Sequence, residues 1–276
     1  MTAGSGGDGG DSFVIVTVAS GARSLRSLEH GETFHPVVGP MAEARGLHVA
    51  QQRLVERARG TQPFVVWDVG LGAAANAIAV LEALSVAETG AVELHSFDAT
   101  LAPLEFARKH AAELGYFTGW ENAVAALLRT GAAQCGAVSW RLQLADFHAS
   151  VADARVPAPH AVIFDPYSPM ANPGLWTRAI FAAIRARAAD ECLLTNYSRA
   201  TPVRVALLGA GWFVGRGGAT GEKDETTIAA TRREMLAAPL DAGWLARVRR
   251  STAAGPAVAD ELRAHPQFLT ADEPPG

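Results

Sequence analysis

Four aspartates stand at the ends of successive apolar runs along the chain. They are the last residues of VVWD, LHSFD, LQLAD and VIFD, namely Asp68, Asp98, Asp146 and Asp165. Short runs rich in β-branched and aromatic residues predict strands. Because ligands bind beyond the carboxyl ends of parallel strands, near the switch in strand order, we expect the four carboxylates to gather at one site.

The first of these strands runs into a glycine-containing loop that opens a helix. Gly70 and Gly72 follow Asp68 in DVGLG, and small residues come next. Glycines let the backbone pass close to a ligand, and a helix N-terminus presents free N–H groups to a polar one. The same pattern also occurs in tight packing turns, so the loop alone does not identify a nucleotide site.

The next two strand ends favour a nucleoside ligand. Asp98 lies 26 residues after Gly72, where a carboxylate can accept both hydroxyls of a ribose, although it can also cap the following helix. Asp146 ends the third strand, where it can accept from an adenine amino group while Phe147 packs on the ring.

The number of acids separates the nucleoside ligands from one another. A phosphorylated nucleotide would be repelled by so many carboxylates, whereas S-adenosylmethionine has no phosphate and carries a positive sulfonium. The chain has no Walker-type Gly-Lys-Ser/Thr, and Ala75 stands where an NAD loop would have its third glycine. The sequence therefore predicts S-adenosylmethionine, with a set of candidate contacts that comprises Asp68, Gly70, Gly72, Asp98, Asp146 and Asp165.

The fourth strand end, DPYSP, carries the candidate catalytic residues Asp165 and Tyr167. An amine of lysine-like basicity must lose a proton before it can accept a methyl group, and Asp165 is placed to take that proton directly or through water. Pro166 fixes the backbone, and Tyr167 offers a face on which a planar base can stack. The alternative is an ordinary Asp-Pro turn in which Asp165 makes a local backbone bond.

Strands alternate with helices from Pro63 onward, which predicts a parallel sheet covered on both faces. Two β-like runs, GWFVGRG and ETTIAATR, have no room for a helix between them and should be antiparallel. We therefore predict an α/β, Rossmann-like class I methyltransferase fold with a mostly parallel seven-stranded sheet, a terminal antiparallel hairpin and a small N-terminal β extension. The predicted strands are 63–70, 91–99, 138–146, 160–167 and 191–198, and the predicted helices are 73–85, 101–114, 173–189 and 201–209.

The predicted organisation has four parts. Residues 1–12 form a Gly-rich disordered leader, 13–62 an extension with a β hairpin and an amphipathic helix over 43–58, 63–232 the methyltransferase core, and 233–276 a partly disordered C-terminal extension. The insertion 115–136 is interpreted as either a lid or an elaborated connection.

Composition excludes several classes of protein. The chain has no apolar run near the roughly 20 residues of a membrane span and no secretory signal, so we expect a cytoplasmic protein without membrane contact. The net charge of −4 means that any nucleic-acid role needs a local basic patch. Two cysteines are too few for a disulfide framework, and no metal site is predicted, because His35, His48 and His148 match no ligand spacing.

The chain resembles the MnmC-like methyltransferases, which complete 5-methylaminomethyl-2-thiouridine at the wobble position of tRNA. The resemblance extends over residues 13 to 231 and is most specific in IFDPYSPMANPGLWT. It is carried further by GETFHPVVGPMAEARGLHV, VWDVGLGAAAN, SFDATLAP, NYSRATPVRVALLGAGWFVG and GATGEKDETTIAA.

This resemblance implies that S-adenosylmethionine is used to methylate the aminomethyl nitrogen of a wobble uridine, with Asp165 as the base. It implies cofactor contacts at Gly70, Gly72, Asp98 and Asp146, and we expect a separate enzyme to supply the aminomethyl precursor. The candidate substrate-binding residues are Tyr167, Asn172, Arg199, Lys223 and Glu43, and Arg199, Arg204 and Arg216 are candidate phosphate contacts.

Three alternatives remain open at this stage. The first is a methyltransferase of the same fold acting on a small amine or another acceptor, which predicts an enclosed pocket that is uncharged or acidic. The tRNA reading instead predicts a positive surface around the Asp165 pocket. The second alternative is a non-catalytic module that binds S-adenosylmethionine, and the third is an NAD-dependent oxidoreductase.

Overall fold

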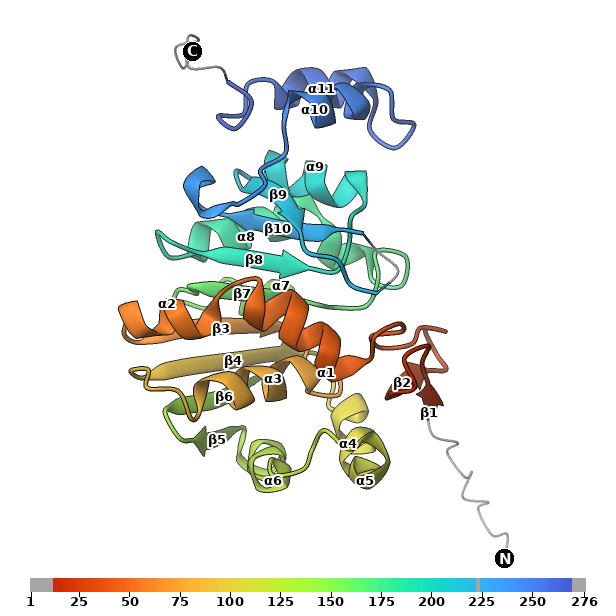
Figure 1. Cartoon of the computed structure of the whole chain (residues 1–276), viewed down its shortest axis with the longest axis vertical. Helices are drawn as coiled ribbons and strands as arrows, with labels where there is room; N and C mark the ends of the chain where they lie inside the picture. The colour runs from red at the N-terminus through yellow and green to blue at the C-terminus, as the bar shows by residue number, and fades with distance from the viewer. Residues whose placement is uncertain (1–11, 222–223, 270–276) are drawn as a thin grey trace, which may run out of the picture.

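The computed structural model describes residues 12–221 and 224–269. The disorder predicted for the first eleven and the last seven residues falls outside this range, and so does the candidate residue Lys223. Eight strands form the main sheet in the order β5-β6-β4-β3-β7-β8-β10-β9, and β1 and β2 form a separate two-stranded sheet (Figure 1). The strands are β1 (Phe13–Thr17), β2 (Arg23–Ser27), β3 (Phe64–Val69), β4 (Val92–Asp98), β5 (Ala132–Cys135), β6 (Val138–Leu144), β7 (Ala161–Phe164), β8 (Leu193–Asn196), β9 (Phe213–Gly217) and β10 (Thr226–Ala230).

The middle of the sheet is parallel, and its two edges are not. Strands β6, β4, β3, β7 and β8 run parallel, and β10 pairs antiparallel with both β8 and β9, which is the predicted terminal hairpin. The sheet has one strand more than predicted, because the insertion 115–136 contributes β5, antiparallel to β6. The chain moves outward through β4 and β6 and then returns to β7 on the other side of β3, which places the switch in strand order between β3 and β7.

Helices cover both faces of this sheet. They are α1 (Pro40–Glu43), α2 (Leu54–Gly60), α3 (Ala75–Leu84), α4 (Ala102–Lys109), α5 (Ala111–Leu114), α6 (Glu121–Thr130), α7 (Phe147–Ser150), α8 (Arg178–Arg187), α9 (Thr201–Gly209), α10 (Ala242–Arg249) and α11 (Gly255–Leu262). The 3₁₀ turns are η2 (Pro173–Trp176) and η3 (Arg233–Met235), and the π-helical segment η1 covers Ala44–Ala50.

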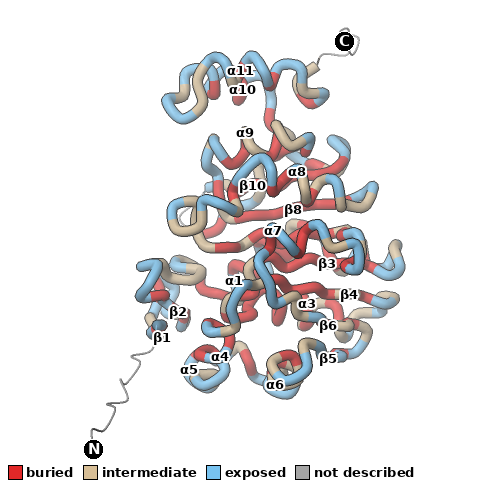
Figure 2. Tube along the Cα trace, turned by 180° about the vertical axis from the view of Figure 1, so that it is seen from behind, coloured by how far each residue is buried: buried red, intermediate tan, exposed pale blue. Residues whose placement is uncertain are grey.

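Strand β3 shows how the sequence makes the two faces. All six of its residues are buried, as expected for a strand covered on both sides. Phe64 and Val66 belong to a core shared with α2, α3, α4 and α6, whereas Val65, Trp67 and Val69 pack with α7, α8 and α9. Figure 2 shows the resulting band of buried chain along the central strands.

The amphipathic helix predicted over 43–58 is interrupted. Its first part continues α1 as η1, in which the Gln51 N–H donates to the Gly46 carbonyl five residues back, and Arg53 then adopts a left-handed conformation with φ of 50° before α2 begins. This winding brings His48 and Gln52 into the core, where both contact the Thr195 hydroxyl of β8. The interruption therefore buries polar side chains that a regular amphipathic helix would keep in solvent.

The segments outside the sheet differ in what they do. The insertion 115–136 packs α6 against the first core through Val124 and Leu127, and none of its residues lines the pocket described below, which favours an elaborated connection over a lid. Beyond β10, α10 and α11 pack on the second core through Trp244, Val248 and Leu262. Among the described residues, no helix has the length and apolar character needed to cross a membrane.

Candidate active site

A pocket of about 590 Å³ opens at the carboxyl ends of β3, β4, β6 and β7, next to the switch in strand order. Its volume lies within the range of roughly 300–1,000 Å³ that is usual for small-molecule sites. Four loops line it after these strands, at 69–73, 97–100, 145–148 and 165–168. The four predicted strand ends therefore do converge on one site.

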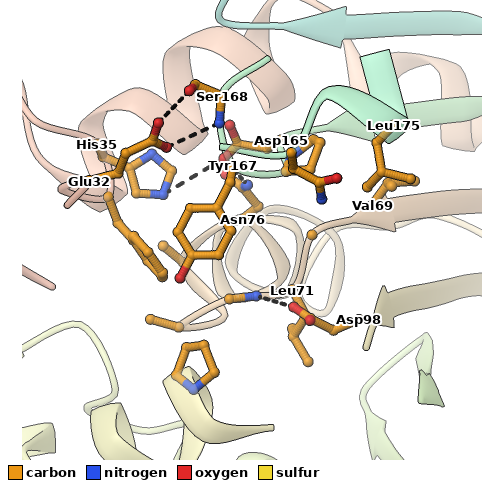
Figure 3. A pocket seen from close by; sticks show the side chains of 18 of the residues that line it. Glu32, His35, Val69, Leu71, Asn76, Asp98, Asp165, Tyr167, Ser168 and Leu175 are labelled. Atoms are coloured by element: carbon orange, nitrogen blue, oxygen red, sulfur yellow. Dashed lines mark hydrogen bonds and ion pairs between the residues drawn. The ribbon is translucent and has the colours of Figure 1, made fainter. Parts of the chain in front are cut away.

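The wall opposite these loops comes from the N-terminal extension. Residues 32–37, between β2 and α1, all line the pocket. The carboxylate of Glu32 accepts hydrogen bonds from the backbone N–H (3.1 Å) and from the hydroxyl of Ser168 (Figure 3). The extension is thus tied to the DPYSP segment and completes the pocket, a contribution that the sequence analysis did not predict for Glu32.

Strand pairing places Asp165 beside the glycine loop. The Asp165 N–H donates to the Val69 carbonyl at 2.9 Å, and the Gly70 N–H donates to the Phe97 carbonyl at 3.0 Å. Gly70 has a φ of 92°, and a Cβ there would lie 2.8 Å from the Asp165 carbonyl oxygen. The absence of a side chain at Gly70 therefore allows the two loops to touch, which is a different reason for the glycine from the close approach to a ligand predicted from sequence.

The carboxylate of Asp165 lies in a polar cluster at the pocket wall. Its side chain is 9% exposed, and Oδ2 accepts a hydrogen bond of 2.7 Å from the Asn76 amide of α3. His35 Nε2 lies 3.8 Å from the same oxygen (Figure 3), and His35 Nδ1 lies 3.7 Å from Oε1 of the buried Glu43. Glu43, a candidate substrate contact, thus lines the pocket and reaches Asp165 through His35.

This geometry changes the interpretation of the three histidines. His35 is a pocket residue between two carboxylates, although its sequence context indicated only a lone histidine. His48 is a core residue, and burial lowers its pKa to about 3. His148 is half-exposed at the pocket mouth, where its ring and N–H both contact Asp146.

Asp98 and Asp146 differ strongly in environment. Asp98 Oδ2 accepts a 2.9 Å hydrogen bond from the Gly72 N–H, and burial raises the pKa of this carboxyl despite that bond. Asp146 caps α7, its side chain is 72% exposed, and the His148 N–H lowers its pKa. Both line the pocket, as predicted, and Asp98 is the one shielded from water.

Asp68 does not line the pocket. It is fully buried in β3, where Oδ2 accepts a 2.7 Å hydrogen bond from the Ser96 hydroxyl, and burial raises its pKa to about 7. Its position favours a role inside the sheet below the glycine loop over the direct cofactor contact predicted from sequence.

Tyr167 lines the pocket, and its ring packs against two aromatic side chains of the N-terminal extension. The ring centroids of His30 and Phe34 lie 4.3 and 5.4 Å from that of Tyr167. Burial raises the Tyr167 pKa to about 12, so the phenol stays protonated at neutral pH. The loop itself is held by the Trp176 indole, which donates to the Tyr167 carbonyl at 2.8 Å, and by the Tyr197 hydroxyl, which donates to Pro166 at 3.1 Å.

Of the remaining candidates, Asn172 lines the pocket and Arg199 does not. Arg199 is exposed between β8 and α9. The prediction that Arg204 meets phosphates is wrong, because its side chain is 3% exposed and is held by Glu225, Thr226 and Thr227. Arg216 is also engaged, with Glu225 at 3.5 Å and Asp241 at 3.7 Å.

Comparison with known proteins agrees with this fold. A family described as S-adenosyl-L-methionine-dependent methyltransferase matches residues 116–232. The "tRNA 5-methylaminomethyl-2-thiouridine biosynthesis bifunctional protein MnmC" of Azoarcus sp. is 28% identical over 250 residues, which is 86% of this chain and 39% of the relative. The protein of the same name from Caulobacter vibrioides is 28% identical over 211 residues, 72% of this chain and 35% of its own length.

The chain has an MnmC-like S-adenosylmethionine-dependent methyltransferase domain. It spans about two fifths of the length of the curated relatives it matches. The fold is that of MnmC2 from Aquifex aeolicus, with a TM-score of 0.71 and 22% identity over 93% of this chain and 86% of that one. A spermidine synthase shares it more distantly, with a TM-score of 0.50 and 12% identity over 81% of this chain and 70% of that one.

The pocket of this MnmC-like domain fits S-adenosylmethionine, its cofactor. The cofactor supplies an electrophilic methyl group carried on a positive sulfonium. Asp98 is a shielded acceptor for ribose hydroxyls, the exposed Asp146 is a candidate for the adenine amino group, and Gly72 leaves room beside Phe34, where a Cβ would lie 3.1 Å from the Phe34 ring. Among the described residues, no group of three or more histidine, cysteine or acidic side chains is arranged to hold a metal.

We expect Asp98→Ala to weaken S-adenosylmethionine binding by about 30-fold, since losing hydrogen bonds to a charged group costs about 2 kcal/mol. Asp146→Ala should weaken it by only about threefold, because an acceptor in solvent contributes less than a shielded one. Isothermal titration calorimetry of both variants measures this difference, and circular dichroism confirms that each is folded. Equal losses at the two positions would contradict the assignment.

Proposed function

We propose that this methyltransferase methylates the aminomethyl nitrogen of 5-aminomethyl-2-thiouridine at the wobble position of tRNA. The observation that carries the proposal is the position of Asp165, a shielded carboxylate in the pocket wall beside the glycine loop, in a chain whose curated relatives are named for this biosynthesis. A carboxylate there can hold the substrate ammonium and then remove its proton.

The charge of the pocket supports an amine as the acceptor. Among the residues that the structure describes, its lining contains five carboxylates and one arginine, Arg26, the acids being Glu32, Glu43, Asp98, Asp146 and Asp165. An acidic lining is also what the small-amine alternative predicts, so the pocket supports an amine as the reacting group but does not distinguish between the molecules that could carry it. The relatives' names favour tRNA, whose phosphates would then be met outside the pocket, with the exposed Arg199 a candidate contact.

Two further parts of the sequence prediction follow from this proposal. Methylation requires an aminomethyl group that is already in place, so a different active site must supply the precursor. A tRNA substrate would also place the reaction in the cytoplasm.

Transfer of labelled methyl from S-adenosylmethionine tests the substrate with three acceptors. These are bulk tRNA carrying 5-aminomethyl-2-thiouridine, the same tRNA from cells that lack the aminomethyl group, and spermidine as a small polyamine. We expect label only in the first. Label in spermidine alone would support the small-amine alternative, and bound cofactor with no transfer to any acceptor would leave a binding module.

A further inference from the structure

The polar cluster around Asp165 continues along the pocket wall in a line of side chains to which the proposed reaction assigns no role. The line runs from Asn76 and Asp165 to His35 and then to Glu43, with separations of 2.7, 3.8 and 3.7 Å. Four separate segments supply it, because Asn76 belongs to α3, Asp165 follows β7, Glu43 ends α1, and His35 lies between β2 and α1. Figure 3 shows the imidazole of His35 directed at Asp165.

The surroundings of His35 suit a group that takes up a proton. Its side chain is only 10% exposed, and its backbone has a φ of 47°, which non-glycine residues rarely adopt. Burial alone would lower the pKa of His35, but the carboxylates of Glu43 and Asp165 outweigh burial and raise the pKa above its ordinary value. The imidazolium form is therefore stabilised at this position.

Other titratable groups near His35 do not replace these two carboxylates. Asp68 of β3 raises the pKa of His35 only through its charge. Burial keeps His48 of η1 neutral, so His48 places no positive charge next to the two carboxylates. The Tyr197 phenol after β8 is also close to Asp165 and Glu43, and burial raises its pKa well above neutrality. Among the described residues near this cluster, His35 and Asp68, whose pKa burial raises to about 7, can thus change protonation near neutral pH, and of these two only His35 lines the pocket.

We propose that His35 is a positioning residue that receives, through Asp165, the proton removed from the acceptor amine, and that Glu43 stabilises the resulting imidazolium. This rests on the proposed function. An N–H bond of the acceptor ammonium breaks, its electron pair stays on nitrogen, and the proton passes from Asp165 Oδ2 to His35 Nε2, so that Asp165 is again a carboxylate. As the nitrogen bonds to the methyl carbon, the bond between that carbon and the sulfonium sulfur breaks, its electron pair stays on sulfur, and S-adenosylhomocysteine leaves. His35 then releases the proton to solvent, and one proton leaves per methyl group transferred.

The proposal predicts how activity depends on pH. Below its pKa, His35 already carries a proton and cannot receive another, so kcat should rise as pH increases through that pKa. Glu43→Gln removes a carboxylate that raises the pKa of His35, and the rise in kcat should then move to lower pH. His35→Asn should abolish that rise and lower the plateau by about a hundredfold, with KM for S-adenosylmethionine changed less than about twofold.

Two measurements on the full chain test this together. The first is the pH profile of kcat on tRNA carrying the aminomethyl precursor, and the second is the His35 titration followed by NMR of ¹³C-labelled histidine with S-adenosylmethionine bound. The matched control is His110→Asn, which removes a histidine paired with Glu113 on the surface at 2.7 Å and should leave both unchanged.

The outcomes are distinct. A parallel shift of the His35 titration and of the kcat profile in Glu43→Gln supports the proposal. A shift of the titration without a shift of the profile, or His35→Asn with the wild-type plateau, overturns it. Wild-type protein that methylates no precursor tRNA would contradict the proposed function. The NMR titration would then test His35 by itself, because an unchanged His35 pKa in Glu43→Gln would show that Glu43 does not stabilise the imidazolium.

Discussion

Asp165→Asn is expected to lower kcat for methyl transfer by about 10³-fold at about pH 7. Asparagine has nearly the same shape, and its side-chain oxygen can still accept the 2.7 Å hydrogen bond from Asn76. It cannot take a proton from the acceptor ammonium. Affinity for S-adenosylmethionine should fall by less than about tenfold, because only one of several acidic neighbours of the sulfonium is lost.

The pH dependence of this defect distinguishes a base from a structural residue. An alkylamine with a pKa near 10 loses its proton to water as the pH rises, so the ratio of wild-type to variant kcat should shrink between about pH 7 and 9.5. Labelled methyl transfer under saturating substrates measures this ratio. A ratio that stays constant with pH would show that Asp165 positions the amine without removing its proton.

Asp190→Asn is the matched control for Asp165→Asn. Asp190 is exposed just before β8, at the edge of the sheet opposite the pocket, and should have no effect on kcat. An Asp165→Asn enzyme with kcat within about threefold of wild type would remove Asp165 from the mechanism.

Gly70→Ala is expected to destabilise the protein by about 3 kcal/mol and to abolish methyl transfer. The added Cβ would lie 2.8 Å from the Asp165 carbonyl oxygen and 2.9 Å from the backbone of Pro166, which are too close for real Cβ contacts. Overpacking of this kind costs about 1–3 kcal/mol, and a φ of 92° adds about 1–2 kcal/mol of strain. Relief of the clash must push Asp165 away from the cofactor loop.

Gly115→Ala separates the clash from the strain. Gly115 has a φ of 77°, but its Cβ would meet no atom within 4 Å, so this variant should lose only about 1–2 kcal/mol. Urea denaturation followed by circular dichroism gives the free energy of unfolding of both variants. An equal decrease in the free energy of unfolding of the two variants would mean that the loops can move apart without an energetic penalty. Gly70 would then be needed only for its backbone conformation.

Much of the fold follows from patterns within single segments. Phe64–Val69 is apolar at every position, so it predicts a strand covered on both faces, and the alternation of such strands with helices predicts the parallel order around it. Residues 233–269 gave no such signal, because α10 and α11 are only eight residues long each and are held by packing on the second core.

The predicted site residues divide in the same way. Asp98, Asp146 and Asp165 each end an apolar run, and strand ends meet at one edge of a parallel sheet, so the sequence by itself placed them together in the pocket. Asp68 is not the last residue of its strand, because β3 continues to Val69. In the structure Asp68 is buried and accepts a hydrogen bond from the Ser96 hydroxyl. Arg204 carries the positive charge that a phosphate contact needs, but only the structure shows that Glu225 and the β10 backbone bind its guanidinium.

The contribution of the N-terminal extension was decided by the tertiary structure alone. The resemblance to MnmC-like proteins includes GETFHP, which contains Glu32 and His35, yet no spacing within one segment indicates that these side chains lie 3.1 Å from the Ser168 N–H and 3.8 Å from Asp165. Contacts between residues about 130 positions apart depend on how two distant segments of the chain pack together. The sequence therefore determined the sheet, the cofactor class and the acids at its strand ends, and the tertiary structure decided which side chains surround Asp165, because that depends on long-range packing.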